Sequence, residues 1–537
     1  HDIFKSEVFE GDVVRLDGNK KYTYVLASSG SLSGSDSYTL YTGGTQMTHD
    51  GSDNGTFAMT GTPTKFTGVK ELSGGSVTPT EDNVATALVF NGSSVTASNA
   101  AGSTLTNPSN LTISGASVTI TASSEISVSG ESASGQLAVN VDKTAEPAGR
   151  VVLNLEGLTL SNSTAAPIYV EAIGDEVQIS AKNGTTNTIS DGVSHTDTYV
   201  DSDGNTNTVN GAIFSRDDLK LKGKGVLIVN GNTEDGIVCK NDLKIWNGNI
   251  TVNAADDGIR GNDSVRIGDP DATDYSTLSV TVNTNNGSSG GDGIKTNSDE
   301  DGKGYITING GTVNIDSYAD GIQAEQTFTM NGGELYITTY QGSNFSGSAS
   351  SGGGWGGPGG GNSNDGSQTM TFNGGYTYVN AAGDGLDSNG NIYFNGGYIF
   401  VSQTGGGNGP LDCGDSNNSI TYSGGTVIAA GSSDMFETPS SYSFLSRTSV
   451  SAGQTITFAD ASGNVLATFT LPNGSSEMVM SSKESGVTCY TGGTLSGTTY
   501  FASQDGTSRC GYGGTISGGT AVSASSGGGQ GGWGGGF

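Results

Sequence analysis

The chain has 537 residues, of which 90 are glycine and 32% are hydrophobic, and its formal net charge is −31. This charge argues against binding to bare nucleic acid or to an anionic membrane surface. The sequence also lacks any run of 18 apolar residues that would insert in a membrane.

The low apolar fraction would indicate disorder in an unpatterned chain. Here, short alternating segments are separated by Gly-rich turns, and helical periodicity is nearly absent. This pattern predicts an all-β protein. The chain begins at His1 without a hydrophobic leader, so we interpret it as the processed chain of an exported protein, extracellular or at the cell surface.

Residues 1–82 are the least repetitive part, with short strand-like segments at 13–16 and 22–26. We expect a β-rich cap or accessory segment there. From residue 83 short strand-like segments become regular, and in segments such as 118–120 and 158–160 a polar residue separates two apolar ones. Gly, Ser and Asn stand between these segments.

A phrase of an acid, a glycine and a large aliphatic residue sets the period of the central region. It occurs at 235–237, 257–259, 292–294, 320–322 and 384–386, with a degraded copy at 409–412. Successive acids lie 22, 35 and 28 residues apart in the first four copies. A unit of this length is typical of one coil of a parallel β-helix.

A second marker, Asn-Gly-Gly, recurs at 309–311, 331–333, 373–375 and 395–397, with Ser-Gly-Gly at 423–425. Glycine there permits a corner with positive φ between two strands. Apolar residues spaced two apart flank each corner and face the interior. We therefore predict an all-β parallel β-helix over 83–436 with a Gly-rich insertion at 342–367, a C-terminal β cap over 437–522 and a Gly-rich tail over 523–537.

The repeated acids predict a calcium site. In-register coils stack about 4.8 Å apart, so a file of carboxylates would repel unless pKa values rise, lysines intervene or calcium binds. Calcium prefers six to eight oxygen ligands. The alternative is that Asp-Gly merely makes a turn; several copies in register favour calcium. The predicted calcium ligands are Asp235, Asp256, Asp257, Asn262, Asp263, Asp292, Asn297, Asp320, Glu325, Asp384, Asp387, Asn389, Asp412 and Asp415.

Aromatic residues alternate outward in the later repeats and predict an exposed aromatic face on the sheet. Sugar rings stack on such faces. Three interpretations stay open: a ligand surface, a surface covered by the insertion with Trp355, or a subunit interface. The residues of this face are Tyr336, Tyr376, Tyr378, Tyr398 and Phe400.

None of the four cysteines forms a C-x-x-C pair, which argues against a zinc site. Cys489 and Cys510 share a C-terminal segment and are candidates for a disulfide. For Cys239 and Cys413, free thiols buried as small hydrophobic groups are an equally good explanation.

Catalysis has weaker support. Lys240 and Lys295 follow two of the acids. A pectate lyase uses bound calcium together with a lysine that acts as the base. More often, however, a lysine beside acids only neutralises their charge.

Several segments resemble a known bacterial family. They are 184–188, 211–215, 235–240, 255–261, 293–295 and 490–494. They resemble the secreted carbohydrate-binding β-helix proteins of clostridia and gut bacteria, which are similar in fold to family 9 polysaccharide lyases. The resemblance covers roughly 150–495.

The resemblance implies a right-handed parallel β-helix, bound calcium, and binding to cellulose or pectic acid rather than cleavage. By position it implies metal ligation by Asp257, Asp263, Asp292, Asp320 and Asp384. The chain departs from the family pattern at 1–80, in the 342–367 insertion and in the tail.

Three functional hypotheses follow. The first is an exported calcium-binding protein that binds cell-wall polysaccharide, either cellulose or pectic acid. The second is a structural subunit that associates with itself in an extracellular fibre or matrix, in which the N-terminal segment pairs with a neighbour's open edge. The third is a calcium-dependent polysaccharide lyase. We expect no nucleic-acid partner. We also expect that the chain is a binding protein rather than an enzyme.

Overall fold

A computed structural model describes residues 83–201, 203–340, 367–405, 407–414, 418–503 and 506–525, together with the backbone of four two-residue strands before residue 82. The chain divides into two compact units, His1–Asp82 and Asn83–Phe537. In the first unit, β1 (Tyr24–Val25) pairs with β4 (Thr56–Phe57), and β2 (Tyr41–Thr42) pairs with β3 (Thr45–Gln46), both antiparallel. The Gly-rich insertion, except its last residue, and most of the tail lie outside the described residues.

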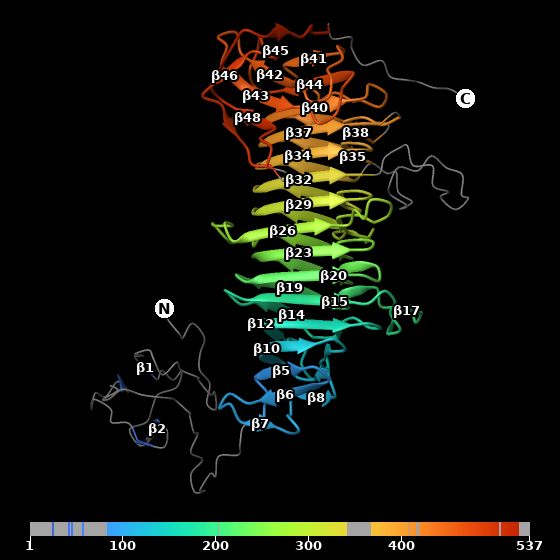
Figure 1. Cartoon of the computed structure of the whole chain (residues 1–537), viewed down its shortest axis with the longest axis vertical. Coiled ribbons are helices and arrows are strands. Elements are labelled where there is room, and N and C mark those ends of the chain that lie inside the picture. Colours follow the sequence, from blue (N-terminus) through green and yellow to red (C-terminus); the bar gives the residue numbers. More distant parts are fainter. Residues whose placement is uncertain are drawn as a thin grey trace. The chain divides into compact units, whose positions relative to one another are not determined.

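The second unit is all-β in its described parts, with long sheets of mainly parallel strands (Figure 1). One run of strands, which we call the front band, is labelled along the middle of Figure 1. It consists of β10 (Ser124–Ser132), β12 (Val151–Asn162), β15 (Thr186–Asp191), β20 (Val226–Gly231), β23 (Gly248–Ala254), β26 (Leu278–Asn283), β29 (Thr312–Ser317), β32 (Glu334–Thr339), β34 (Tyr376–Ala381), β37 (Tyr398–Gln403) and β40 (Thr426–Gly431).

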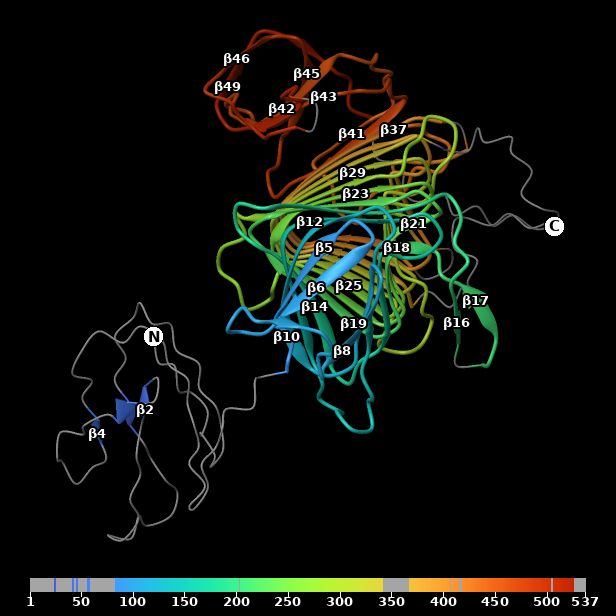
Figure 2. The same ribbon diagram turned by 60° about the horizontal axis from the view of Figure 1, so that its bottom comes forward.

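A second run, the rear band, is joined to the front band through β10 and β12. Figure 2 shows the two bands as walls in which each strand lies behind the previous one. The rear band consists of β14 (Glu176–Ala181), β19 (Asp218–Gly223), β22 (Asp242–Ile245), β25 (Ser264–Ile267), β28 (Tyr305–Ile308), β31 (Thr327–Met330), β33 (Thr369–Phe372), β36 (Asn391–Phe394) and β39 (Ile420–Tyr422).

A third run of shorter strands, the side sheet, follows the front strand of most repeats. It consists of β8 (Leu111–Ser114), β9 (Ser117–Ile120), β11 (Gln136–Asn140), β13 (Ile168–Ala172), β18 (Gly211–Ser215), β21 (Asp235–Cys239), β24 (Ile259–Gly261), β27 (Ile294–Lys295) and β30 (Ile322–Gln323). It ends at β30. Its place is then taken by a separate parallel pair, β35 (Leu386–Ser388) with β38 (Leu411–Cys413).

Strict two-residue alternation builds the core. In the front band Val280, Val313 and Leu335 pair in register, and in the rear band Ile306, Phe328 and Met370 do the same. Most of these side chains are fully buried. Each strand thus buries its apolar face against its neighbours in the stack, as the sequence pattern predicts.

The Asn-Gly-Gly corners join rear strands to front strands as predicted. The second glycine has a φ of 85° at Gly311, 83° at Gly333 and 81° at Gly375. A Cβ on Gly333 would lie 2.4 Å from the Gly311 carbonyl oxygen, so glycine is required for space as well as for φ.

The asparagines of these corners form a ladder along the stack. The Nδ2 atoms of Asn331, Asn373 and Asn395 each donate to the Oδ1 of the preceding asparagine over 2.9 Å. Such ladders satisfy the amides and hold the repeats in register.

Antiparallel strands close both ends of the front band. At one end β5 (Ala87–Asn91) pairs in parallel with β10, and the antiparallel strands β6 (Ser94–Ser98) and β7 (Thr104–Leu105) follow it. At the other end β44 (Glu477–Ser481) pairs antiparallel with β40 and with β41 (Phe444–Ser446). The C-terminal part forms a separate lobe in Figure 2. It consists of β42 (Thr455–Ala459), β43 (Val465–Thr470), β45 (Thr488–Thr491), β46 (Thr494–Ser496), β47 (Thr499–Tyr500), β48 (Cys510–Tyr512), β49 (Thr515–Ser517) and β50 (Thr520–Ala521).

The predicted Cys489–Cys510 disulfide is wrong, because all four cysteines are free thiols. The strand order β48-β43-β42-β45 separates the two residues by three strand spacings, or about 14 Å. Cysteines that are bridged by a disulfide have Cα atoms within about 7 Å. The described residues contain no helix that is long and apolar enough to cross a membrane.

Candidate functional site

The repeated acids stand where front strands turn into the side sheet, and backbone hydrogen bonds link them. The Oδ1 of Asp235 accepts the N–H of Asp257 over 3.1 Å. Asp257 accepts that of Asp292, and Asp292 that of Asp320, each over 2.9 Å. Each carboxylate therefore caps the corner of the next repeat.

Cations neutralise the first part of this ladder. Arg260 lies 2.5 Å from Asp235, and Lys295 lies 2.8 Å from Asp292 and 3.8 Å from Asp257. Burial, Asp257 and Asp256 raise the pKa of Asp235 to about 7 although Arg260 opposes the shift. Sequence reasoning missed Arg260 as a counter-ion. Its signal is a position directly after the Asp-Gly-Ile phrase, the place that Lys295 takes in the next repeat.

The other predicted ligands near this part do not converge on one point. Asn262 donates its amide N–H to Asp263, and Lys303 lies 3.1 Å from the Asp263 carboxylate. Asp256 and Asn297 are exposed at the surface. Turn capping and pairing with Arg260, Lys295 and Lys303 are the interactions that the structure gives these acids.

The later acids differ, because no ion pair reaches Asp320, Asp384 or Asp387 among the described residues. Burial, then Asp292, Asp387 and Asp384, raise the pKa of Asp320 to about 7, although the charge of Lys295 opposes the shift. Burial, Asp384 and Glu437 raise the pKa of Asp387 to about 6. The three carboxylates thus lie close enough to repel one another.

These acids line a cavity of about 770 Å³ at the place where the side sheet is interrupted between β30 and β35. Asn389 and Glu325 also line it, and its floor is the core itself, with Phe328 and Leu335. Within the described residues, no group of three His, Cys, Asp or Glu side chains has the geometry of a formed metal site. Asp412 pairs in register with Asp387, and Asp415 lies outside the described residues.

Thr377 lies in this cavity at a position that is apolar in the neighbouring repeats. It pairs with Leu335 on one side and Ile399 on the other. Its side chain is 1% exposed, and its hydroxyl has no hydrogen-bond partner in the described part of the chain.

The prediction of an exposed aromatic face is wrong, because the C-terminal lobe covers it. Tyr336, Tyr376, Tyr378 and Phe400 are all less than 10% exposed. Phe501 stacks on Tyr376 with 4.0 Å between ring centroids. Further ring contacts join Tyr398 to Tyr512, and Tyr378 and Phe400 to Phe469.

The cover that the structure shows is the C-terminal lobe, which the sequence did not suggest. Trp355, which the sequence suggested for this role, lies outside the described residues. Apolar rings on one sheet and apolar rings on the lobe bury each other, and this burial explains why so many aromatics stand on an outer face.

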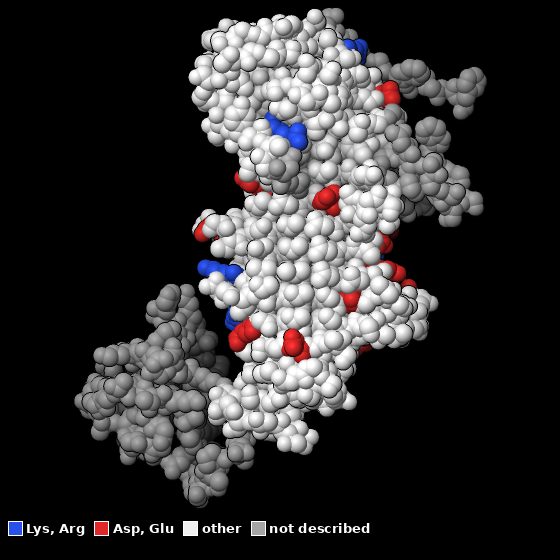
Figure 3. Space-filling view, viewed as in Figure 1, with Lys and Arg blue, Asp and Glu red and all other residues white. Residues whose placement is uncertain are grey.

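The uncovered part of the front band carries hydroxyls and amides. Three outward columns run across β15 to β29, and they contain almost no charge; Figure 3 shows how few charged side chains this face presents. The columns are Thr186, Val226, Asn249, Ser279 and Thr312; Thr188, Ile228, Thr251, Thr281 and Asn314; and Ser190, Asn230, Asn253, Asn283 and Asp316.

A groove of about 460 Å³ lies where this polar face meets the C-terminal lobe. It is lined by Thr281, Asn283, Thr312, Asn314, Asp316, Glu334, Tyr336, Ala502 and Ser503. Tyr336 donates its hydroxyl to Glu334 over 3.1 Å, and Asn285 donates its amide to Asp316 over 3.1 Å. Hydroxyls and amides both donate and accept hydrogen bonds, as sugar hydroxyls do.

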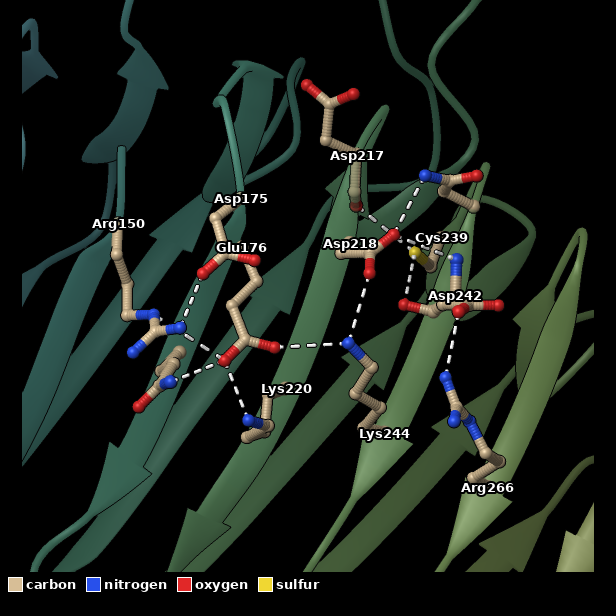
Figure 4. A network of polar contacts seen from close by, with 12 residues as sticks. Arg150, Asp175, Glu176, Asp217, Asp218, Lys220, Cys239, Asp242, Lys244 and Arg266 are labelled. Atoms are coloured by element: carbon tan, nitrogen blue, oxygen red, sulfur yellow. Dashed lines mark hydrogen bonds and ion pairs between the residues drawn. The ribbon is translucent and has the colours of Figure 1, made fainter. Parts of the chain in front are cut away.

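The rear band carries the opposite chemistry, a lattice of ion pairs (Figure 4). Glu176 contacts Lys220 over 2.7 Å and Lys244 over 3.2 Å. Asp242 contacts Arg266 over 2.8 Å. Lys220, Lys244 and Arg266 form a basic column in register, and the acidic column beside it, with Glu176 and Asp242, neutralises most of its charge.

Neither lysine of the lyase hypothesis has the surroundings of a general base. Asp292 and Asp257 raise the pKa of Lys295 although burial opposes them, so its amine holds its proton at neutral pH. The Nζ atom of Lys240 lies over the rings of Tyr199 and Phe214, at 5.4 Å and 5.7 Å from their centroids.

Comparison with known proteins places these features in a family. The model of the carbohydrate-binding domain-containing proteins matches residues 114–409, just over half of the chain. A carbohydrate-binding domain-containing protein of Acetivibrio thermocellus is 34% identical over 251 residues, which are 47% of this chain and 78% of that protein. The solved structure of the polysaccharide lyase-like protein from C. thermocellum, a gadolinium derivative, is 32% identical and covers 48% of this chain and 92% of its own, with a TM-score of 0.40.

The matched residues include most of the front band, the polar side of the groove and the acid ladder. The chain belongs to the family of carbohydrate-binding domain-containing proteins.

Proposed function

We propose that the chain binds polysaccharide on the polar outer face of the front band and in the groove beneath the C-terminal lobe. The observation that carries this proposal is the groove itself, in which hydroxyls, amides and two carboxylates surround a space of about 460 Å³. A rigid sheet places these groups at fixed spacings, about 4.8 Å from strand to strand. Membership of a carbohydrate-binding family supports the same conclusion.

The proposed architecture is a right-handed parallel β-helix, in which front, side and rear strands form successive coils. Parallel in-register pairing at a distance of one repeat supports it. The proposed setting is extracellular or at the cell surface, which the acidic composition supports.

We propose calcium at Asp320, Asp384 and Asp387 rather than along the whole ladder. These residues supply carboxylate oxygens, which hard cations prefer as ligands. Within the described residues no ion pair joins them to a lysine or arginine, although Lys295 also lines the cavity and pairs with Asp292. Asn389 and Asn408 line the same cavity and add amide oxygens. Calcium bound there would offset the mutual repulsion of the three acids.

The binding proposal is tested by a pull-down on cellulose and on polygalacturonate, with and without a chelator. The groove variant is Thr281→Ala with Asn314→Ala, and the matched control is Thr307→Ala with Thr329→Ala on the outer face of the rear band. We expect the groove variant to bind at least about fivefold more weakly and the control to bind like the unmodified chain. No binding by the unmodified chain in any condition would refute the proposal.

The fibre-forming alternative remains a prediction, and electron microscopy of native material tests it. Regular filaments would support it. The antiparallel strands at both ends of the front band do not favour it, because they occupy edges with which a neighbour would pair.

A further inference from the structure

We propose that Asp316 and Glu334 make the groove select neutral polysaccharides and reject acidic ones. This inference rests on the proposed binding function and assigns its ligand class. The two acids are the charged residues among the described groove residues, and no lysine or arginine lines the groove with them.

Both carboxylates are held in place. Glu334 accepts the hydroxyl of Tyr336, and Asp316 accepts the amide of Asn285. Burial and Glu334 raise the pKa of Tyr336, so its hydroxyl keeps its proton and continues to donate. Because these hydrogen bonds fix the acids, neither side chain is free to turn away from a bound chain.

A groove with this charge favours sugars that offer hydroxyls. Carboxylates accept hydrogen bonds from sugar hydroxyls, and charge-assisted bonds of this kind are stronger than neutral ones. A uronate would place its own carboxylate near Asp316 or Glu334, and like charges brought together at an interface cost binding energy.

The basic residues in the ion pairs described above are not among the described residues that line the groove. Lys220, Lys244 and Arg266 are paired in the ion-pair lattice, and Arg260 and Lys295 pair with the acid ladder. The proposed calcium ligands line the cavity at the interrupted side sheet, and none of them lines the groove. The sequence did not distinguish between cellulose and pectic acid as ligands, and the acidic groove favours the neutral polymer.

The test measures binding of full-length protein to two soluble polymers, hydroxyethylcellulose and polygalacturonate, by isothermal titration in chelator at low and high salt. The test variant is Asp316→Asn with Glu334→Gln, since both amides still accept the two hydrogen bonds. The control variant is Glu156→Gln with Asp301→Asn, which makes the same change in net charge at exposed sites outside the groove.

We expect the unmodified chain to bind the neutral polymer at least about tenfold more tightly than the uronate at low salt. The groove variant should gain about three- to tenfold in uronate affinity and keep its neutral affinity within about twofold. The control variant should behave like the unmodified chain. High salt should narrow the difference, because it screens the repulsion.

Equal affinity of the unmodified chain for both polymers would overturn the selectivity while leaving the binding function intact. Equal gains in the groove and control variants would also overturn it, because net charge would then be the cause. Absence of binding to both polymers would overturn the proposed function and this inference with it.

Discussion

At the residue scale, Thr377 is a polar group in an apolar column. Its buried hydroxyl lacks a partner among the described residues, and such a group costs about 1–3 kcal/mol. We predict that Thr377→Val raises the free energy of unfolding by about 1 kcal/mol, measured by urea denaturation. The matched control is Val379→Thr, two residues along the same strand, which should lower the free energy of unfolding. Destabilisation by both changes would show that the Thr377 hydroxyl does not cost stability.

His195 is a second buried polar residue, and it lies between two acids. Its Nε2 is 3.1 Å from Asp191, its Nδ1 is 3.5 Å from Asp197, and Nδ1 also donates to the Val209 carbonyl over 2.7 Å. Burial lowers the pKa of His195, but Asp191, the Val209 carbonyl and Asp197 together raise it above its usual 6.5. The imidazolium is therefore the favoured form in the folded chain.

Because the folded pKa is raised, the stabilisation is fully present below about pH 6.5 and is lost as pH rises through the folded pKa. We predict that His195→Gln loses more stability, relative to the unmodified chain, at pH 5.5 than at pH 9. Urea denaturation at the two pH values measures the difference. A loss that is the same at both would show that His195 acts only through packing.

Asp320 tests the calcium proposal. Its raised pKa means that its charge destabilises the fold near and above pH 7 when no cation is bound. We predict that Asp320→Asn raises the melting temperature in chelator at pH 7.5 and abolishes most of the gain that calcium gives the unmodified chain. As a control, Asp301→Asn should leave the calcium effect unchanged; a calcium effect that survives in Asp320→Asn would refute the site.

At the element scale, the corners of the repeat were the part most easily predicted. The Asn-Gly-Gly marker combines a residue that forms ladders with one that adopts positive φ, and both properties are local. The spacing of the Asp-Gly-Ile phrase likewise indicated that Asp235, Asp257 and Asp292 lie in register, and backbone hydrogen bonds join them in this order.

Gly333 tests the corner. Alanine there would have a φ of 83° and a Cβ 2.4 Å from the Gly311 carbonyl oxygen. We predict a loss of about 2 kcal/mol or more in unfolding free energy for Gly333→Ala, measured by urea denaturation. Gly332→Ala is the matched control, because its Cβ would come no closer than 3.1 Å and its φ is not positive; similar losses for both would contradict this explanation.

The cover over the aromatic columns could not be predicted from the strands that carry it. Alternation correctly placed Tyr376 and Tyr398 on the outer face, and nothing in their own strands indicates a partner. The partners, Phe501 and Tyr512, lie more than 100 residues later and are set by how the C-terminal lobe packs. Long-range packing of this kind leaves no periodic trace in a single sequence.

The positive partners of the repeated acids could also not be predicted from the sequence alone. The sequence indicated that a file of acids needs positive charge, and it offered calcium and lysine as sources. Only the geometry distinguishes Asp235, which Arg260 neutralises, from Asp320, which lacks such a partner among the described residues.

At the scale of the whole molecule, the front band has two outer surfaces. One is the polar face on β15 to β29, and the other is the aromatic face that the C-terminal lobe covers. The lobe ends where the hydroxyl and amide columns begin, and the groove lies at that boundary. The rear band carries most of its charge in ion pairs. The front band, with its groove, is the surface on which we propose that polysaccharide binds.

The most direct measurement is hydrogen–deuterium exchange of the full-length protein, with and without saturating hydroxyethylcellulose. The account predicts slower exchange in β26, β29 and β32 and no change in β19, β22 and β25 of the rear band. Protection of the rear band instead, or no protection of the front band at saturation, would contradict it.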